Sequence, residues 1–314
     1  AAVAAGLCPF SLGTDTAGSI RIPAAWNGVA GLKPTYGRVS IHNVVAQSFT
    51  ADHAGPLARS VADLALVLQA IAGFDPRDPE ASREPVPDYA AALEGGVGGL
   101  RIGVPRELLA LGMEPAVEGA LDAARRVLQE LGCEVDGISV PLLAEATPIN
   151  KTVIMAETTA RHDEWAGTWF AGRERVYGAD VAEWLEIGRT IPAPDFVRAS
   201  RRRRRLADDL RAALTRVDLL LVPTAPCVAP PFGASTVRLG GRDVGLLDVA
   251  IHFLCAFSLA GLPALSVPAG FDPASGLPVG IQLVGRAFDE ANVLRAGHAF
   301  ERATGHHRRH PDLG

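Results

Sequence analysis

Ser19 is the residue of this sequence best suited to nucleophilic chemistry, because it follows a run of small residues. Residues 14–19 read TDTAGS, and such side chains leave backbone N–H groups open to a ligand. If a helical turn begins at Ile20, with Pro23 tolerated early in it, Ser19 lies at the positive end of a helix. A serine hydroxyl beside converging N–H groups can attack a carbonyl carbon and stabilise the oxyanion that results.

Two simpler interpretations compete for the same fragment. A serine after a glycine at a helix start often serves only as an N-cap. A phosphate loop would need the pattern GxxxxGK[ST], but no lysine follows Gly18. The sequence also lacks the GxSxG elbow of the α/β-hydrolases. By itself, the fragment leaves a capping serine and a catalytic serine as alternatives.

Histidines next to carboxylates suggest a different catalytic arrangement. His53 follows Asp52, and His162 precedes Asp163. Sequence neighbours do not orient one another as the members of a Ser-His-Asp triad do, so neither pair is expected to act in this way. His306, His307 and His310 could bind a metal, but we expect a frayed tail, with no metal and no cofactor.

The elements that must position Ser19 follow from hydrophobic periodicity. Residues 60–73 predict an amphipathic helix with Ser60 as its N-cap. Residues 100–105, 117–132 and 133–140 predict a β-α-β unit, and residues 151–216 are mostly helical. Buried strands are expected after residue 218 and over 277–285, a short helix near 89–93, and a final helix that begins near Asp289.

Together these elements predict one α/β domain over residues 1–314, with a central mixed sheet covered by helices on both faces. Residues 249–271 contain no Asp, Glu, Lys or Arg, but two prolines and a glycine divide them. We expect a short buried helix and a strand there, and no membrane span. Five consecutive arginines, residues 201–205, fan around a helix and are expected to form a solvated, ion-paired face.

The net charge and the cysteines indicate which binding partners and which cellular compartment to expect. The net charge of -5 gives no basic field for nucleic acid. The four cysteines have no CxxC spacing and are expected to be reduced, structural thiols in a cytoplasmic protein: Cys8, Cys133, Cys227 and Cys255.

The segment GTDTAGSIRIPAAWNGVAGLKPTYGRVS resembles the signature of the amidase signature family. Similarity continues in order through DHAGPLARSVADLALVLQAIAGFDPRDP, DLLLVPTAPCVAPP, FSLAGLPALSVPAGF and GLPVGIQLVGRAFDEANVLRAGHAFE to the terminal HHRRHPDL. The resemblance covers nearly the whole chain. It implies the amidase signature fold and hydrolysis of a carboxylic amide C–N bond.

The resemblance also implies roles for particular residues. The family uses a Ser–cis-Ser–Lys triad, and Ser19 matches its nucleophile, which reacts through an acyl-enzyme intermediate. The backbone N–H groups of an oxyanion hole would come from Thr16, Ala17, Gly18 and Ser19. Asp15 and Arg21 are candidates for bracing the loop, and Arg21 also for contacting an acidic substrate.

Two features depart from the family pattern. Ala17 stands where the family commonly has a second glycine, which places the oxyanion geometry in question. The bridging serine should belong to a Gly/Ser-rich run just before Ala1, and the catalytic lysine should lie further upstream. Neither Lys33 nor Lys151 matches that lysine. We therefore expect an N-terminally truncated amidase domain that is inactive by itself.

Three functions stay open at this stage. The first is a stand-alone amidase for a small-molecule amide, which the terminal HHRRHPDL and the DH of ADHAGPL favour. The second is the glutaminase (A) subunit of a tRNA-dependent amidotransferase, which requires protein partners. The third is a catalytically incompetent fragment or pseudoenzyme. The substrate is undetermined, as is the oligomeric state, for which a homodimer is one arrangement.

Overall fold

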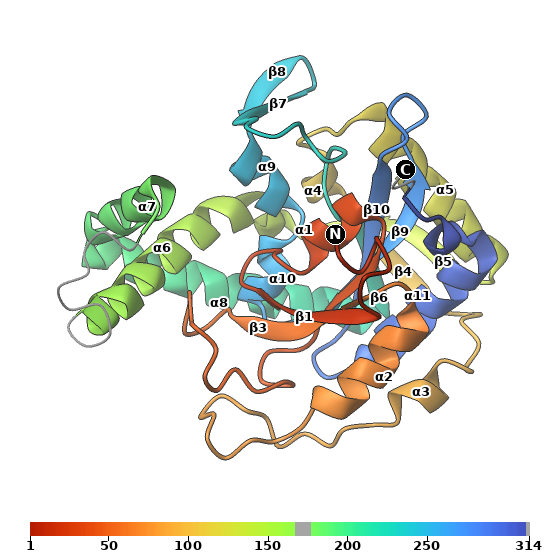
Figure 1. The fold of residues 1–314 in the computed structure, drawn as a ribbon, viewed down its shortest axis with the longest axis horizontal. Helices are drawn as coiled ribbons and strands as arrows, with labels where there is room; N and C mark the ends of the chain where they lie inside the picture. Colours follow the sequence, from red (N-terminus) through yellow and green to blue (C-terminus); the bar gives the residue numbers. More distant parts are fainter. Residues whose placement is uncertain (167–176, 312–314) are drawn as a thin grey trace.

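An eight-stranded mixed sheet forms the centre of the computed structural model, which describes residues 1–166 and 177–311 (Figure 1). Strand β4 runs parallel to its neighbours β5 and β6, and the other pairings are antiparallel. Across the sheet the order is β1 (Phe10–Asp15), β3 (His53–Ala58), β2 (Ala30–Lys33), β9 (Ala264–Phe271), β10 (Pro278–Val284), β6 (Leu219–Pro223), β4 (Arg101–Pro105) and β5 (Glu134–Ile138).

Alternation along β6 explains why helices cover both faces of this sheet. Leu219 and Leu221 join one hydrophobic cluster, whereas Leu220 and Val222 join another. Successive side chains of a strand point to opposite faces, so an apolar strand needs a cover on each side. The predicted fold class, an α/β domain with helices on both faces of a mixed sheet, is confirmed.

The helices divide between the two faces by the cluster to which they contribute. The first cluster holds α2 (Val61–Ile71), α3 (Tyr89–Ala92), α5 (Pro115–Glu130) and α11 (Glu290–Thr304). The second holds α4 (Arg106–Leu109), η1 (Pro141–Glu145), α6 (Ala146–Ala166), α8 (Ala193–Arg216), α9 (Leu246–His252) and α10 (Cys255–Leu259). The remaining elements are α1 (Arg21–Asn27), α7 (Ala179–Arg189), the hairpin β7 (Thr236–Leu239) and β8 (Arg242–Gly245), and η2 (His306–Arg308).

Several predicted elements occur at their expected places. Helix α2 begins after Ser60, whose hydroxyl accepts the N–H of Asp63 at 3.1 Å. The β-α-β unit is β4, α5 and β5, with its two strands parallel. Residues 249–271 contribute to α9, α10 and β9, and among the described helices none is long and apolar enough to cross a membrane. All four cysteines are free thiols.

Candidate active site

The chain turns sharply after β1, and this turn brings Ser19 to the surface. Gly18 has a φ of 142°, and a Cβ there would lie 2.5 Å from Leu254 Cδ1. Helix α1 begins at Arg21, so Pro23 falls in its first turn, where a missing N–H costs no helical bond. Ser19 is exposed between the end of the strand and the start of the helix.

Four consecutive N–H groups, those of residues 16–19, lie outside the regular hydrogen-bond network. Within the described part of the chain, no acceptor takes a hydrogen bond from any of them. The next N–H, of Ile20, donates to Asp15 Oδ2 at 3.2 Å, and the N–H of Ile22 donates to Gly18 O at 2.8 Å. A row of unpaired donors beside an exposed hydroxyl is the arrangement that an oxyanion hole needs.

Ala17 adopts an ordinary backbone conformation in this turn. Among the described residues other than glycine, a positive φ occurs only at Asn43 and Phe288. The conformation that requires a glycine is therefore at Gly18, and Ala17 is accommodated at negative φ without strain.

Beneath the turn, Asp15 and Arg21 form a fully buried ion pair. Nε and Nη2 of Arg21 donate to the two carboxylate oxygens of Asp15, each at 3.0 Å, and both side chains are 0% exposed. Burial acts to raise the pKa of Asp15, but the guanidinium charge and its hydrogen bonds hold that pKa well below its usual range. Arg21 thus faces inward, whereas Ser19 lies at the surface.

The other N–H groups of Arg21 reach segments that are distant in sequence. Nη1 donates to Gln282 Oε1 at 3.0 Å and to Leu254 O at 3.3 Å, and Nη2 donates to Ser258 Oγ at 2.8 Å. Gln282 in turn donates to Phe253 O at 2.7 Å. Gln282 is the single polar residue of segment 277–285, a signal that could have marked it in the sequence. Ser258 carries no comparable signal.

Asp52 fixes the start of the turn through Thr16. The hydroxyl of Thr16 donates to Asp52 Oδ1 at 2.5 Å, and Oδ2 accepts the N–H groups of Gln47 and Ser48 at 2.6 and 2.9 Å. Burial raises the pKa of Asp52, although these hydrogen bonds oppose the increase. Asp52 is therefore an anchor for the Ser19 turn, a role that the sequence did not suggest.

Both histidines considered for a triad have other partners. Nδ1 of the buried His53 lies 2.6 Å from Ala51 O, and burial lowers the pKa of His53 well below its usual value. Nδ1 of His162 lies 2.8 Å from the hydroxyl of Tyr177. Neither histidine forms a hydrogen bond with Ser19 among the described residues.

The two lysines are also held elsewhere. Lys33 is fully buried, and its Nζ donates to Leu262 O at 2.5 Å and to Pro34 O at 3.2 Å. Burial lowers the pKa of Lys33 well below its usual value. Lys151 forms an ion pair with Asp248 at 2.5 Å.

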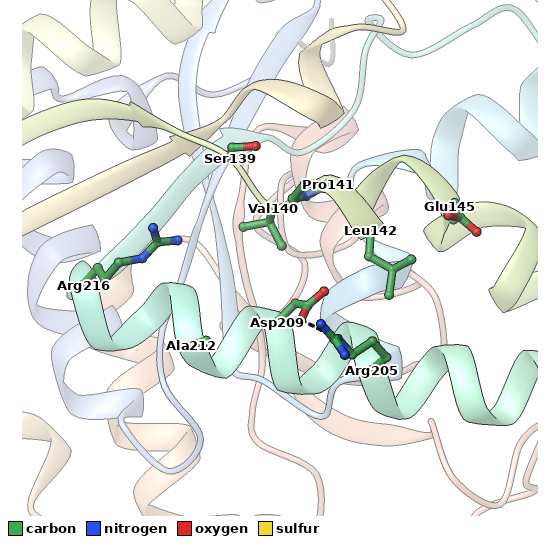
Figure 2. A pocket seen from close by; sticks show the side chains of 9 residues that line it. All are labelled: Ser139, Val140, Pro141, Leu142, Glu145, Arg205, Asp209, Ala212 and Arg216. Carbon is green, nitrogen blue, oxygen red and sulfur yellow. Dashed lines mark hydrogen bonds and ion pairs between the residues drawn. The ribbon is translucent and has the colours of Figure 1, made fainter.

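Four of the five arginines at residues 201–205 of α8 are exposed, as predicted, but Arg203 is half-buried and donates to Leu259 O at 2.8 Å. Arg205 pairs with Asp209 at 2.9 Å, and Arg202 pairs with Glu145 of η1. Figure 2 shows the first of these pairs in a cavity of about 600 Å³ between η1 and α8. The nine residues that line this cavity come from segments 139–145 and 205–216, and none belongs to the Ser19 turn.

The expectation of a frayed histidine tail is wrong for residues 306–310. Helix α11 ends at Gly305, and η2 follows it directly. The ring of His306 packs edge-on against Phe271 at 6.2 Å, and Arg59 donates to His307 O at 3.2 Å. These contacts hold the segment against Phe271 of β9 and against Arg59, which follows β3. Among residues 1–166 and 177–311, no group of three or more ligating side chains could bind a metal.

Comparison with protein families gives one clear result. The family model described as Amidase matches residues 1–294. The A subunit of glutamyl-tRNA(Gln) amidotransferase from Roseiflexus sp. (strain RS-1) is 43% identical over 335 aligned positions, which include 100% of this chain and 67% of that relative.

Solved structures give the same result. One structure comes from work on a vestigial protein complex and the origins of an s-triazine catabolic enzyme. It matches with a TM-score of 0.90 at 31% identity, and the matched region is 96% of this chain and 65% of that protein's chain. A bacterial aryl acylamidase of the amidase signature family matches with a TM-score of 0.85 at 28% identity, and the matched region is 98% of this chain and 65% of the acylamidase chain. The chain thus spans about two thirds of the length of these relatives.

Proposed function

This chain belongs to the amidase signature family, and on that premise we propose that Ser19 is the acyl-accepting nucleophile of an amide hydrolase. The observation that carries the proposal is an exposed serine next to four unpaired backbone N–H groups. Asp15, Lys33 and His53 are buried, and each is bound to partners within the fold.

The reaction has two balanced steps. The Ser19 Oγ attacks the amide carbonyl carbon, its proton passes through the base to the leaving nitrogen, and the C–N bond breaks to release ammonia or an amine. Water then attacks the acyl-serine ester, which releases the carboxylic acid and restores the hydroxyl. No cofactor enters either step.

The N–H groups of Thr16, Ala17, Gly18 and Ser19 would stabilise the negative charge on the carbonyl oxygen in both steps. Loss of one such donor costs about 3 kcal/mol of transition-state stabilisation in serine hydrolases. Asp15 and Arg21 would hold this turn in place from below. Because Arg21 is fully buried, its role is positioning and not contact with the substrate.

The base is proposed to lie outside residues 1–314. Lys33 and Lys151 have other partners, and a serine hydroxyl without a base is a weak nucleophile near pH 7. We therefore expect the whole protein to supply a bridging serine and a lysine, and the chain of residues 1–314 to be unreactive alone. A gene that encodes neither group upstream would contradict this mechanism.

Two settings for this chemistry are supported by different observations. The 43% identity to the A subunit of an amidotransferase favours a glutaminase that works with partner proteins. The likeness to an aryl acylamidase, with a TM-score of 0.85, favours a stand-alone amidase.

A fluorophosphonate probe tests the nucleophile. The whole protein should be labelled at Ser19, with the adduct located by peptide mass spectrometry. The variant Ser19→Ala should lose the label, whereas Ser11→Ala, at another exposed serine, should keep it. Labelling that persists in Ser19→Ala would refute the assignment.

Ammonia release separates the two settings. The whole protein, purified without partners, would be assayed with glutamine and with simple aryl and alkyl amides. Release only from glutamine and only with partner proteins present would support the glutaminase setting. Release from simple amides by the isolated protein would support the stand-alone amidase.

A further inference from the structure

A cavity of about 630 Å³ lies between helices α6 and α7, close to the segment that anchors the Ser19 turn. Its walls come from residues 45–47, from Thr158 and His162 of α6, from Val181 and Trp184 of α7, and from Leu247 of α9. Figure 1 shows α6 and α7 side by side at one end of the molecule. The cavity is large enough for an aromatic or branched aliphatic amide.

Hydrogen bonds and packing connect this cavity to the Ser19 turn. Gln47 lines the cavity, and its N–H donates to Asp52, the same carboxylate that accepts the hydroxyl of Thr16. The hydrophobic cluster that supports Ala17 includes Ile154, one turn before Thr158 on α6, and Ile251, one turn after Leu247 on α9. The same elements therefore shape the cavity wall and support the turn.

Three apolar side chains in the cavity walls are exposed. Val45 is 67% exposed, Val181 is 39% exposed and Leu247 is 47% exposed, and all three line this one cavity. Trp184 adds an aromatic surface and is half-buried. Exposed apolar side chains that gather around a cavity mark a site for an apolar ligand.

The charges around the cavity disfavour an anion. Asp180 is the only carboxylate among its lining residues, and no arginine or lysine lines it within the described chain. Burial lowers the pKa of His162, which keeps the imidazole neutral near pH 7. The nearby cations of α6 and α7 are paired with carboxylates: Lys151 with Asp248, Arg161 with Glu164, and Arg189 with Asp163 and Glu186.

We propose that this cavity binds the aromatic or branched aliphatic part of an uncharged amide and rejects the same amide when that part carries a carboxylate and no cation. A carboxylate placed there would lose its hydration beside Asp180 without gaining a cation. The inference rests on the proposed function, because it assigns the substrate class of the Ser19 site.

Matched ligands test the selectivity by binding alone. Titration calorimetry would compare 4-methylbenzamide with 4-carbamoylbenzoate, which differ by a methyl group against a carboxylate. The chain of residues 1–314 and the whole protein should each bind the neutral amide at least about tenfold more tightly than the carboxylate. Equal binding of the two benzamides, or no binding of 4-methylbenzamide, would overturn the proposal.

One substitution should alter this preference. Val181→Arg places a cation in the cavity wall, and the neutral-to-anion affinity ratio should fall by about tenfold. Val197→Arg makes the same change at a valine of α8 that is 54% exposed and lies outside the cavity, and it should leave the ratio unchanged. Identical ratios in both variants would place the binding elsewhere and overturn the proposal.

The variant Ser19→Ala separates this inference from the proposed function. It should bind 4-methylbenzamide as the unaltered protein does, because binding needs no acyl transfer. If Ser19 is not labelled but the selectivity follows Val181→Arg, the cavity assignment holds and the nucleophile assignment fails. If Ser19 is labelled but the selectivity is absent, the opposite conclusion follows.

Discussion

Two buried ion pairs hold turns in this molecule, and they differ in how completely their polar atoms are satisfied. In the Asp15–Arg21 pair, both carboxylate oxygens accept from the guanidinium at 3.0 Å. In the pair of Arg38 and Glu290, Nε lies 3.5 Å from Oε2, and both of these atoms lack a hydrogen bond. Both pairs are almost fully buried.

The difference follows from what each pair must hold. Glu290 accepts the N–H of Thr35 at 2.8 Å, and Arg38 donates to the carbonyl oxygens of Glu84 and Pro85 at 2.9 and 3.0 Å. These contacts join loops to one another. An ion pair can do this without precise hydrogen-bond geometry. The bidentate pair below Ser19 fixes orientation as well as position. On the proposed function, the turn directs four N–H groups toward one substrate oxygen, and this requires a fixed orientation as well as a fixed position.

Removal of Arg21 should produce the largest effect. Arg21→Met leaves the Asp15 carboxylate buried without its partner, and we expect a loss of about 3 to 5 kcal/mol in the free energy of unfolding. Chemical denaturation at pH 7 measures this loss. The double variant Asp15→Leu with Arg21→Met removes both charges and should recover part of it. A loss below about 1 kcal/mol in the single variant would show that water reaches the pair.

Gly18 tests whether the ion pair alone shapes the turn. Gly18→Ala forces an alanine into a φ of 142° and places its Cβ 2.5 Å from Leu254 Cδ1. We expect a loss of about 2 to 4 kcal/mol in the free energy of unfolding. Gly112→Ala is the matched control, because Gly112 has a φ of 82° with open space around it. If both variants lose the same free energy of unfolding, the close packing around Gly18 does not contribute to stability.

The looser ion pair should tolerate change better. Glu290→Gln keeps an oxygen for the N–H of Thr35 and removes the charge opposite Arg38. Arg38 retains its carbonyl acceptors and its contact with the Phe288 ring at 4.7 Å, so we expect a loss of only about 1 to 3 kcal/mol. Chemical denaturation beside Arg21→Met gives the comparison. A loss equal to that of Arg21→Met would remove the distinction between the two pairs.

The sequence predicted the elements that local rules determine and missed those that depend on distant partners. Helix α2 and the β4-α5-β5 unit were evident from periodicity and capping residues. Strands β2 and β3 were not predicted, because Ala30–Lys33 and His53–Ala58 are short and contain glycine or proline. Their pairing with each other and with β1 and β9 makes them strands.

The same limit applies to the site. Ser19 and its small neighbours could be found from residue types, and Asp15 and Arg21 from their nearness to it. Ser258 lies 237 positions from its partner Arg21, and Asp52 lies 36 positions from Thr16. The residues next to Ser258 and Asp52 in the sequence give no indication of these long-range contacts.

Glu301 is a buried carboxylate that has no guanidinium partner within the described chain, and it can be compared with Asp15 and Glu290. Glu301 accepts the N–H of Val61 at 2.9 Å, and His298 and His307 lie 3.9 and 4.0 Å from its Oε1. Burial raises the pKa of Glu301 from 4.5 to about 7, with a contribution from Asp63 that Arg308 and the N–H of Val61 oppose. The folded state therefore keeps a proton that the unfolded state releases.

This difference fixes the sign of the pH dependence. The protonated Glu301 contributes stability in full below pH 4.5, and that stability is lost as the pH rises toward 7, by at most about 1.4 kcal/mol per unit. Glu301→Gln stays neutral, so its free energy of unfolding should fall less between pH 5 and pH 7. Because His298 and His307 lie within 4.0 Å of Glu301, both proteins would also carry His298→Gln and His307→Gln, which removes the imidazole titrations from the comparison. Equal slopes in the two proteins would mean that Glu301 is ionised in the fold, and that a buried carboxylate here needs no arginine.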